Sequence, residues 1–239
     1  GAGLAGTIAD CSITDSSRLP GSGYIPLEKL YIDIPAANRV AIQNTTIRGG
    51  PVCGGIVKLG AGSLTMTNCL IASTGGHGLQ VNAGTCTVAN CTVADNAGWG
   101  VSNAPALVTI TNSILWGNYH GGMCSTSGTF SYTCSQEALA GTGNLNTNPL
   151  WIAGYYLSTN GLSWQTSNSP CIDAGSMSAA AAGLDTRTTR TDATNDEGQL
   201  DLGYHALAGF ASSFSNMNLY VDVITGSDVN DGWTAGNAL

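Results

Sequence analysis

The stretch "MTNCLI" (residues 66–71) recurs as "VANCTV" (88–93), with Asn and Cys in the same places. The same phrase returns as "IQNTTI" (42–47) and "ITNSIL" (110–115), and more faintly as "IADCSI" (8–13). Its first residue falls at positions 42, 66, 88 and 110, so the phrase has a nearly constant period. A repeat of this length is typical of a solenoid, in which each repeat stacks on the previous one.

Each phrase follows a run that alternates apolar and polar residues, as in "LTMT" (64–67) and "CTVA" (86–89). This alternation predicts short strands with every second residue facing inward. The Asn after each run tolerates the left-handed backbone that a corner requires. After the corner, the position of Leu70 is expected to face outward; the equivalent positions are Thr46, Thr92 and Ile114.

Coils of this length, stacked about 4.8 Å apart, place equivalent residues above one another. We therefore predict an asparagine ladder in which each side-chain amide bonds to the next, made of Asn44, Asn68, Asn90 and Asn112. The next column holds small side chains: Thr45, Cys69, Cys91 and Ser113. The spacing is compatible with a Cys69–Cys91 disulfide, and buried free thiols are the alternative.

The period fades after Asn118. Residues 130–136, "FSYTCSQ", predict one more strand, and a Cys124–Cys134 disulfide would close the loop before it. Later turn-rich segments predict an irregular cap over the open end of the stack, with four aromatic residues as covering material: Trp151, Tyr155, Tyr156 and Trp164. The predicted fold is all-β, a parallel solenoid of ~22-residue coils with three short strands per coil and essentially no helix.

Composition excludes several partners and suggests a location. Charged residues make up 9% of the chain, against about 25% in an ordinary soluble domain, and the formal net charge is −8. Clustered basic residues for phosphate contacts are absent, which argues against nucleic acid. No apolar run reaches the ~18 residues of a membrane span. Eight cysteines without a C-x-x-C pair favour an oxidising, extracellular or cell-surface location.

Catalytic patterns are missing from the repeats. A polysaccharide hydrolase needs two carboxylates about 5–10 Å apart, and Asp95 is the only acidic residue between positions 42 and 118. A lyase needs a base and a means of neutralising a uronate, yet Arg48, Lys58 and His77 each stand alone. We interpret Arg48 and Lys58 as solvated surface charges. The sequence favours a role other than catalysis.

Calcium is the one cofactor that the sequence suggests. Residues 191–201 supply Asp192, Asn195, Asp196, Glu197 and Asp201, and residues 226–232 supply Asp228, Asn230 and Asp231. Carboxylate and amide oxygens around Gly suit this cation. Neither stretch matches the D-x-[DN]-x-[DN]-G frame, so Asx-rich turns without metal are the alternative. In that case Arg187 and Arg190 neutralise the first cluster.

Three further segments carry a family resemblance: "NLNTNPLW" (144–151), "NSPCIDAG" (168–175) and "TDATNDEGQLDLGYHAL" (191–207). With the repeat, they make the chain resemble the right-handed parallel β-helix proteins of the pectate-lyase-like superfold. Within it, the chain is similar to the branch found in secreted and surface-anchored bacterial proteins. The resemblance covers roughly residues 40–207 and implies the fold. It implies no single function, because the superfold hosts lyases, hydrolases, adhesins and passive stalks.

The last segment, residues 218–239, resembles the start of such a domain although it comes at the end. We therefore expect a β-helix with its cap over residues 1–210, less regular from about 120, and a separate segment over residues 211–239. The chain is then either a slice of a longer tandem protein, or its last segment docks on the first coil of a neighbouring copy. The docking side chains would be Tyr220, Val221 and Val223.

The sequence thus predicts an extracellular structural module, either part of a surface stalk or a subunit of a head-to-tail homopolymer. The alternative is a polysaccharide lyase or hydrolase, or a carbohydrate-binding adhesin, on the same fold. Trp99 and Trp116 would then stack on sugar rings; otherwise they pack at coil corners.

Overall fold

The structure is a computed structural model of the 239-residue chain. It describes residues 4–14, 30–50, 54–103, 107–123, 128–152, 154–161 and 165–208. Within these ranges no helix is long and apolar enough to cross a bilayer. The predicted docking segment and the second acidic stretch lie outside the described residues, and so does Cys124.

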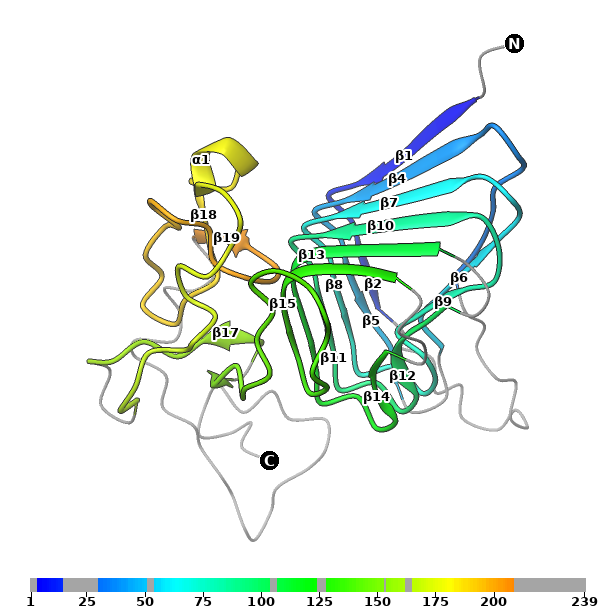
Figure 1. The fold of residues 1–239 in the computed structure, drawn as a ribbon. Coiled ribbons are helices and arrows are strands. Elements are labelled where there is room, and N and C mark those ends of the chain that lie inside the picture. The colour runs from blue at the N-terminus through cyan, green and yellow to red at the C-terminus, as the bar shows by residue number, and fades with distance from the viewer. Residues whose placement is uncertain are drawn as a thin grey trace, which may run out of the picture.

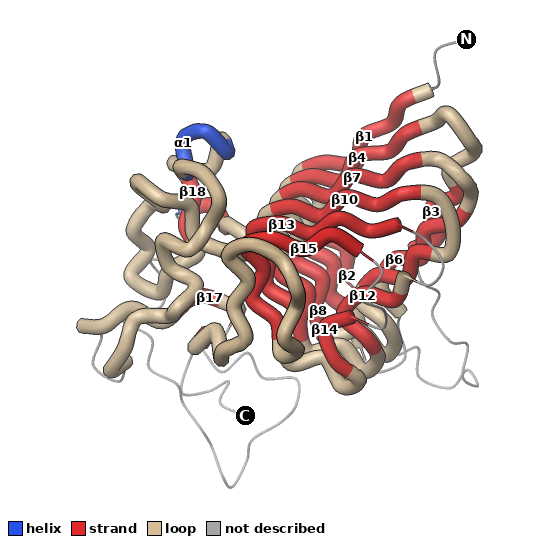
Figure 2. Tube along the Cα trace, viewed as in Figure 1, coloured by secondary structure: helices blue, strands red, loops and turns tan. Residues whose placement is uncertain are grey.

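The first half of the chain is a parallel β-solenoid with three strand-bearing faces (Figures 1 and 2). The first face stacks β1 (Ala5–Ala9), β4 (Arg39–Gln43), β7 (Ser63–Thr67), β10 (Thr85–Ala89), and the first halves of β13 (Leu107–Trp116) and β15 (Gly128–Ser135). The second face stacks β2 (Ser12–Thr14), β5 (Thr46–Arg48), β8 (Leu70–Ala72), β11 (Thr92–Ala94) and the second halves of β13 and β15. The third stacks β3 (Leu30–Asp33), β6 (Ile56–Leu59), β9 (Leu79–Val81), β12 (Trp99–Ser102) and β14 (Gly121–Met123). The predicted fold class is confirmed.

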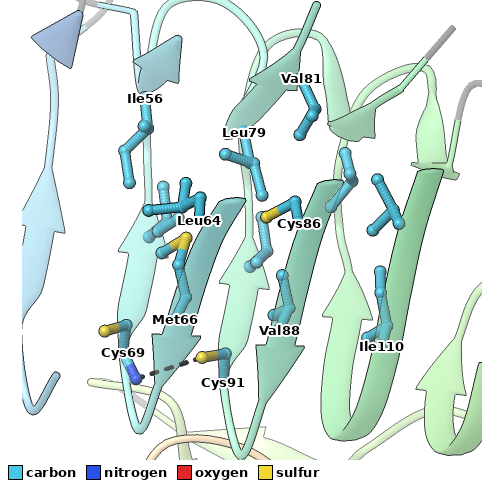
Figure 3. Close-up of a cluster of buried hydrophobic side chains, with 14 of the residues drawn as sticks. Ile56, Leu64, Met66, Cys69, Leu79, Val81, Cys86, Val88, Cys91 and Ile110 are labelled. Atoms are coloured by element: carbon cyan, nitrogen blue, oxygen red, sulfur yellow. Dashed lines mark hydrogen bonds between the residues drawn. The ribbon is translucent and has the colours of Figure 1, made fainter. Parts of the chain in front are cut away.

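The register reproduces the sequence period. Thr85 pairs with Ser63 on one side and with Leu107 on the other, so neighbouring coils are offset by one full repeat of the sequence. Inward positions consequently form columns, one of which holds Ile42, Met66, Val88 and Ile110, all without solvent exposure. Figure 3 shows such side chains filling the space between the faces. The alternation of apolar and polar residues along each strand therefore builds a continuous core.

We call the described residues from 144 to 208 the cap. It contains the small antiparallel pairs β16 (Trp151–Ile152) with β17 (Tyr156–Leu157), and β18 (Arg187–Thr188) with β19 (Ala206–Leu207). Its one described helix is the single turn α1 (Ala179–Ala182), which Ser178 caps at its N-terminus and Gly183 ends with φ 69°. The cap is thus mostly loop, held by its own buried side chains.

The position of the cap differs from the prediction. It lies against the second face of the solenoid rather than over the end of the stack (Figure 1). Within the described part of the cap, the short segment around Leu145 extends the last coil, where Leu145 forms a β-bridge with Cys134. The outward-facing Leu70, Thr92 and Ile114 are consequently 1%, 2% and 1% exposed. They point outward as predicted, but the cap removes most of them from water.

Candidate functional site

One corner of the solenoid repeats in every coil. Six non-glycine residues there have φ between 48° and 54°: Asp10, Asn44, Asn68, Asn90, Asn112 and Tyr132. The backbone N–H of Asn68 donates to the Ala89 carbonyl at 3.0 Å, and that of Asn90 donates to Thr111 at 3.2 Å. Left-handed backbone is costly for most residues, and Asn tolerates it best among those with a side chain. The corner therefore explains why Asn recurs.

The residue after each corner explains the recurring Cys. Its side chain donates to the carbonyl two residues earlier: Cys11 to Ala9, Thr45 to Gln43, Cys69 to Thr67, Cys91 to Ala89, Ser113 to Thr111 and Thr133 to Ser131. The same side chain also accepts from the neighbouring coil, because the N–H of Cys69 donates to Cys91 Sγ at 3.3 Å (Figure 3). The position thus selects a small side chain that both donates and accepts.

Cys69 and Cys91 are free thiols in the structure, which corresponds to the second of the two sequence alternatives. A disulfide between them would remove both S–H donors from their carbonyl acceptors. Burial also raises the pKa of the Cys91 thiol well above its ordinary value, which keeps it protonated. Cys134 is likewise a free thiol, and its predicted partner Cys124 lies outside the described residues.

The asparagines stack, but they do not bond in an unbroken series. Asn68 Nδ2 donates to Asn44 Oδ1 at 3.0 Å, as the ladder prediction requires. Asn90 Oδ1, in contrast, is buried without a hydrogen-bond partner. The oxygens of Asn68 and Asn112 accept instead from the cap. Among the described residues, the bond between Asn68 and Asn44 is thus one rung of the predicted ladder, and Asn68 and Asn112 also serve another purpose.

That purpose is docking of the cap. Asn68 Oδ1 accepts from the N–H of His205 at 2.7 Å, and Asn68 Nδ2 donates to the carbonyl of His205 at 3.0 Å. Asn112 Oδ1 accepts from the N–H of Ser176 at 2.9 Å. Between them, Thr92 Oγ1 accepts from the N–H of Tyr204 at 3.0 Å. Three successive coils thus hold the cap through buried polar groups that would otherwise lack partners.

A second polar column lies inside the next corner, and the sequence analysis missed it. Asn96 Nδ2 donates to Asn118 Oδ1 at 2.8 Å, and Asn96 Oδ1 accepts from the N–H of Thr74 at 3.0 Å. Gln136 continues the column, because its Oε1 accepts from the N–H of Asn118 at 3.1 Å. The signal was present, since Thr74, Asn96 and Asn118 follow one another at the interval of the repeat.

Three carboxylates meet inside the cap: Asp173, Asp196 and Asp201, with ligand atoms within 4.8 Å of one another. Arg190 bridges two of them, through Nε to Asp201 Oδ2 at 2.9 Å and through Nη2 to Asp173 Oδ1 at 3.3 Å. The Asp201 side chain has no solvent exposure. Its hydrogen bond raises the pKa of Arg190, so the guanidinium remains charged. Arg190 therefore compensates a buried carboxylate.

His205 compensates the other buried carboxylate. Its Nε2 lies 2.7 Å from Asp196 Oδ2, and neither side chain is exposed. Its Nδ1 faces the carbonyl of Gly203 at 3.0 Å, which can only accept, so Nδ1 carries a proton. A second proton must lie between Nε2 and Oδ2. His205 is thus a packed residue of the cap, and it joins the acidic cluster to Asn68.

The arrangement does not fit calcium. Both oxygens of Asp201 are occupied by four donors, namely the N–H of Asp173, Thr189 Oγ1 and two guanidinium nitrogens of Arg190. Asp192 Oδ1 accepts from the N–H of Thr194 in its own turn. Asp196 Oδ1 alone is buried without a partner among the described carboxylates. Calcium needs six to eight oxygen ligands, so this cluster instead matches the alternative of neutralisation by arginine.

The interpretation of Lys58 as a solvated surface charge is wrong, because the Lys58 side chain has no solvent exposure. Its Nζ donates to the carbonyls of Gly60 at 2.5 Å and Ala83 at 2.6 Å, joining two coils. Burial lowers the pKa of Lys58, with the charges of Cys86 and Asp33 acting in the opposite direction. The long side chain therefore acts as a cross-coil hydrogen-bond donor.

Arg48 lies beside the cap in a shallow pocket of about 370 Å³. The pocket is also lined by Asp95, Trp151, Ile152, Gly154 and Tyr155. The guanidinium carbon of Arg48 is 5.3 Å from the centre of the Tyr155 ring, and the Trp151 and Tyr155 rings meet edge to face at 5.1 Å. The pocket thus offers two aromatic rings, a cation and a carboxylate between solenoid and cap.

The contacts of His77, Trp99 and Trp116 are packing contacts and hydrogen bonds within the fold. His77 Nδ1 accepts from the backbone N–H of Trp99 at 3.0 Å, one coil further on. Trp99 contacts the ring of His120, with centroids 5.8 Å apart. Trp116 packs against the buried cluster that contains Leu157 and Leu202 of the cap. Trp116 therefore takes the packing role among the alternatives given above.

Comparison with known proteins agrees with this geometry. The family model described as "Right handed beta helix region" matches residues 4–137, which covers the solenoid from β1 to just past β15. None of the curated proteins matches the chain. No solved structure matches it either. The chain therefore belongs to the right-handed β-helix family.

Proposed function

We propose that the chain is an extracellular structural module whose β-helix is continued by strand addition at its first coil. The observation that carries the proposal is the state of that coil. Among the described residues, β1, β2 and β3 each pair on one side only, with β4, β5 and β6. Such edges expose unpaired backbone groups and invite a further strand.

The side chains of the first coil support this proposal. Leu4, Ile13 and Tyr31 are 77%, 36% and 56% exposed, whereas Ile47 and Val57, which pair with Ile13 and Tyr31 in the next coil, are 4% and 3% exposed. Exposed apolar side chains at the end of a solenoid favour a covering partner. Residues 218–239 suit this role by their resemblance to the start of a β-helix domain, with Tyr220, Val221 and Val223 as docking side chains.

The partner is then a second copy of the domain, either a separate chain in a head-to-tail filament or the next unit of a tandem stalk. Both forms need a stiff unit. The buried asparagine corners, the cross-coil Lys58 and the laterally docked cap supply that stiffness. The low content of charged residues also lets neighbouring units approach closely without strong repulsion.

The test uses a chain that ends at residue 217 and a synthetic peptide of residues 218–239. The proposal predicts that the peptide binds the truncated chain and protects the backbone amides of β1 and β2 from hydrogen exchange. A control peptide carries Ser at positions 220, 221 and 223 and is expected not to bind. If the native peptide leaves the amides of the first coil unprotected, the proposal is wrong. Electron microscopy of the full chain then separates filament from stalk, since only the filament form polymerises.

A second function, carbohydrate binding, is favoured by the pocket beside the cap. Aromatic rings stack on sugar faces, while Arg48 and Asp95 are placed to bond hydroxyl or carboxylate groups. Titration calorimetry with neutral and uronate oligosaccharides tests this reading. Binding that is lost in Trp151→Ala and Arg48→Met would support it. Equal heats for these variants and the unmodified chain would exclude this pocket as the binding site.

A further inference from the structure

Cys134 and Cys171 meet where the solenoid contacts the cap. Cys134 lies on β15 in the last described coil, and Cys171 lies in the turn "SPCIDAG" of the cap. Both are 0% exposed and belong to one buried cluster with Ile114, Leu157 and Leu202. Their thiols hydrogen-bond each other. Two segments that are distant in the sequence thus bring two sulfurs into direct contact.

This pair differs from the pair formed by Cys69 and Cys91. Cys69 and Cys91 belong to the repeated corner, where each thiol donates to the carbonyl two residues before it. Thr45, Ser113 and Thr133 make the same bond with a hydroxyl, so that position needs a donor rather than a sulfur. Cys134 and Cys171 lie outside this column. Their contact joins the solenoid to the cap, whereas the hydrogen bond between the thiols of Cys69 and Cys91 joins two neighbouring coils. Cys134 Sγ also donates to the carbonyl of Thr147 at 3.2 Å, which likewise lies in the segment after the solenoid rather than two residues before it.

We propose that Cys134 and Cys171 are a modification site: they form a disulfide that covalently joins the cap to the solenoid when the chain folds in the presence of a small-molecule disulfide. The pairing replaces the Cys124–Cys134 disulfide expected from the sequence. It does not depend on the proposed filament or stalk function.

The chemistry is a pair of thiol–disulfide exchanges. In the first exchange Cys134 loses its proton and attacks as the thiolate. Its sulfur bonds to one sulfur of oxidised glutathione and releases one glutathione thiolate. Cys171 then loses its proton and attacks the Cys134 sulfur of the mixed disulfide, releasing the second glutathione. Two protein thiols are oxidised, and one glutathione disulfide is reduced to two thiols.

Burial of both thiols determines when the disulfide exchange can take place. Neither thiol is accessible in the folded protein, so the exchange takes place while the cap is undocked, during folding. The bond then closes the loop between positions 134 and 171 in the unfolded chain. Such a closure raises the thermal midpoint by on the order of 10 °C.

The experiment refolds the full chain from denaturant in a glutathione redox buffer. Free thiols are then alkylated in denaturant, and the digested chain is mapped by mass spectrometry. The expected product is a peptide pair linking Cys134 to Cys171, two hydrogen masses lighter than the reduced peptides, while Cys69 and Cys91 are alkylated. Alkylation of both Cys134 and Cys171 overturns the proposal, as does linkage of Cys134 to Cys124.

A stability measurement adds a second readout. Reduction is expected to lower the thermal midpoint of the oxidised chain by on the order of 10 °C and to leave Cys134→Ser/Cys171→Ser unchanged. The matched control Cys69→Ser/Cys91→Ser should keep the full reducible shift. If the control loses the shift, the stabilising bond lies in the repeated corner and the proposal is wrong. The mapping on the unmodified chain decides the matter even if a variant fails to fold.

Discussion

The side-chain amide of Asn68 and the backbone of His205 form a two-way hydrogen-bonded pair, although 137 residues separate them. The amide donates at 3.0 Å and accepts at 2.7 Å, as one strand does toward a neighbouring strand. Asn68 also holds φ at 51°, so one residue turns the coil and docks the cap. Gly would allow the turn but not the pair, and Asp would lack the donor.

Replacing Asn68 by Gly separates these two roles. The left-handed corner is kept, but the buried N–H and carbonyl of His205 lose their partners. We expect Asn68→Gly to lower the free energy of unfolding by about 2–4 kcal/mol, because three side-chain hydrogen bonds, one to Asn44 and two to His205, are lost and a buried donor is left unsatisfied. Urea denaturation measures the change.

Asn90→Gly is the matched control. Asn90 has φ 54° in the same column, but its Oδ1 has no partner. We expect this variant to cost about 1 kcal/mol or less. Equal destabilisation by the two substitutions would show that the corner needs Asn for a reason other than cap docking.

The small-donor column makes a prediction about Cys91. Its thiol donates to the carbonyl of Ala89 at 3.1 Å and accepts from the N–H of Cys69 at 3.3 Å. Ser113 makes equivalent bonds in the next coil. The free energy of unfolding of Cys91→Ser should therefore lie within about 1 kcal/mol of that of the unmodified chain, whereas that of Cys91→Ala should be about 1–3 kcal/mol lower than that of Cys91→Ser. Urea denaturation measures these differences. If Ala is tolerated as well as Ser, the hydrogen bonds of this column contribute little.

Arg190 makes a prediction about the cap. Arg190→Met leaves the fully buried side chain of Asp201 without its countercharge, which typically costs about 3–5 kcal/mol. Arg187→Met is the control, since the Arg187 guanidinium makes a long 3.5 Å bond to the carbonyl of His205. Chemical denaturation followed by tryptophan fluorescence compares them. Similar stabilities of the two variants would contradict the assigned role of Arg190.

Lys58 gives a pH dependence with a definite sign. Burial lowers its folded-state pKa below the ordinary value of 10.5, so the unfolded chain binds more protons between the lowered pKa and 10.5. Stability conferred by Lys58 therefore rises with pH through that window. Burial raises the pKa of the neighbouring Cys86 thiol to about 12. This thiol is present in the unmodified chain and in a Lys58 variant alike, so its contribution largely cancels when their free energies of unfolding are compared.

The measurement is the difference in the free energy of unfolding between the unmodified chain and Lys58→Met, under reducing conditions from pH 7 to pH 10. The difference should shift in favour of the unmodified chain as pH rises. A difference that stays constant would mean that Lys58 titrates equally in both states.

The repeat allowed the solenoid to be predicted, because its information is local. Alternation along "LTMT" and the recurrence of Asn once in each repeat specify strand, corner and register together. The same logic would have found the second polar column, had the interval between Asn96 and Asn118 been followed. Lys58 was misjudged because sequence alone does not show that carbonyls from two coils converge on its ammonium group.

The cap was harder to predict because its contacts are long-range. Leu70, Thr92 and Ile114 were correctly placed on the outer side, but their burial depends on residues much later in the chain. Likewise, Asp173 joins Asp196 and Asp201 only through the folding of the cap, so the sequence stretch 191–201 gave two of the three carboxylates. The periodicity of apolar residues does not indicate which outer face of the solenoid the cap covers.

The most direct test of the docking role of the asparagine column is hydrogen exchange of the backbone amides of Ser176, Tyr204 and His205. These amides donate to Asn112, Thr92 and Asn68, respectively. We expect strong protection in the unmodified chain and in Asn90→Gly, and loss of protection at His205 in Asn68→Gly while the amides of β10 and β13 stay protected. Unchanged protection of His205 in Asn68→Gly would contradict the claim that the solenoid corner holds the cap.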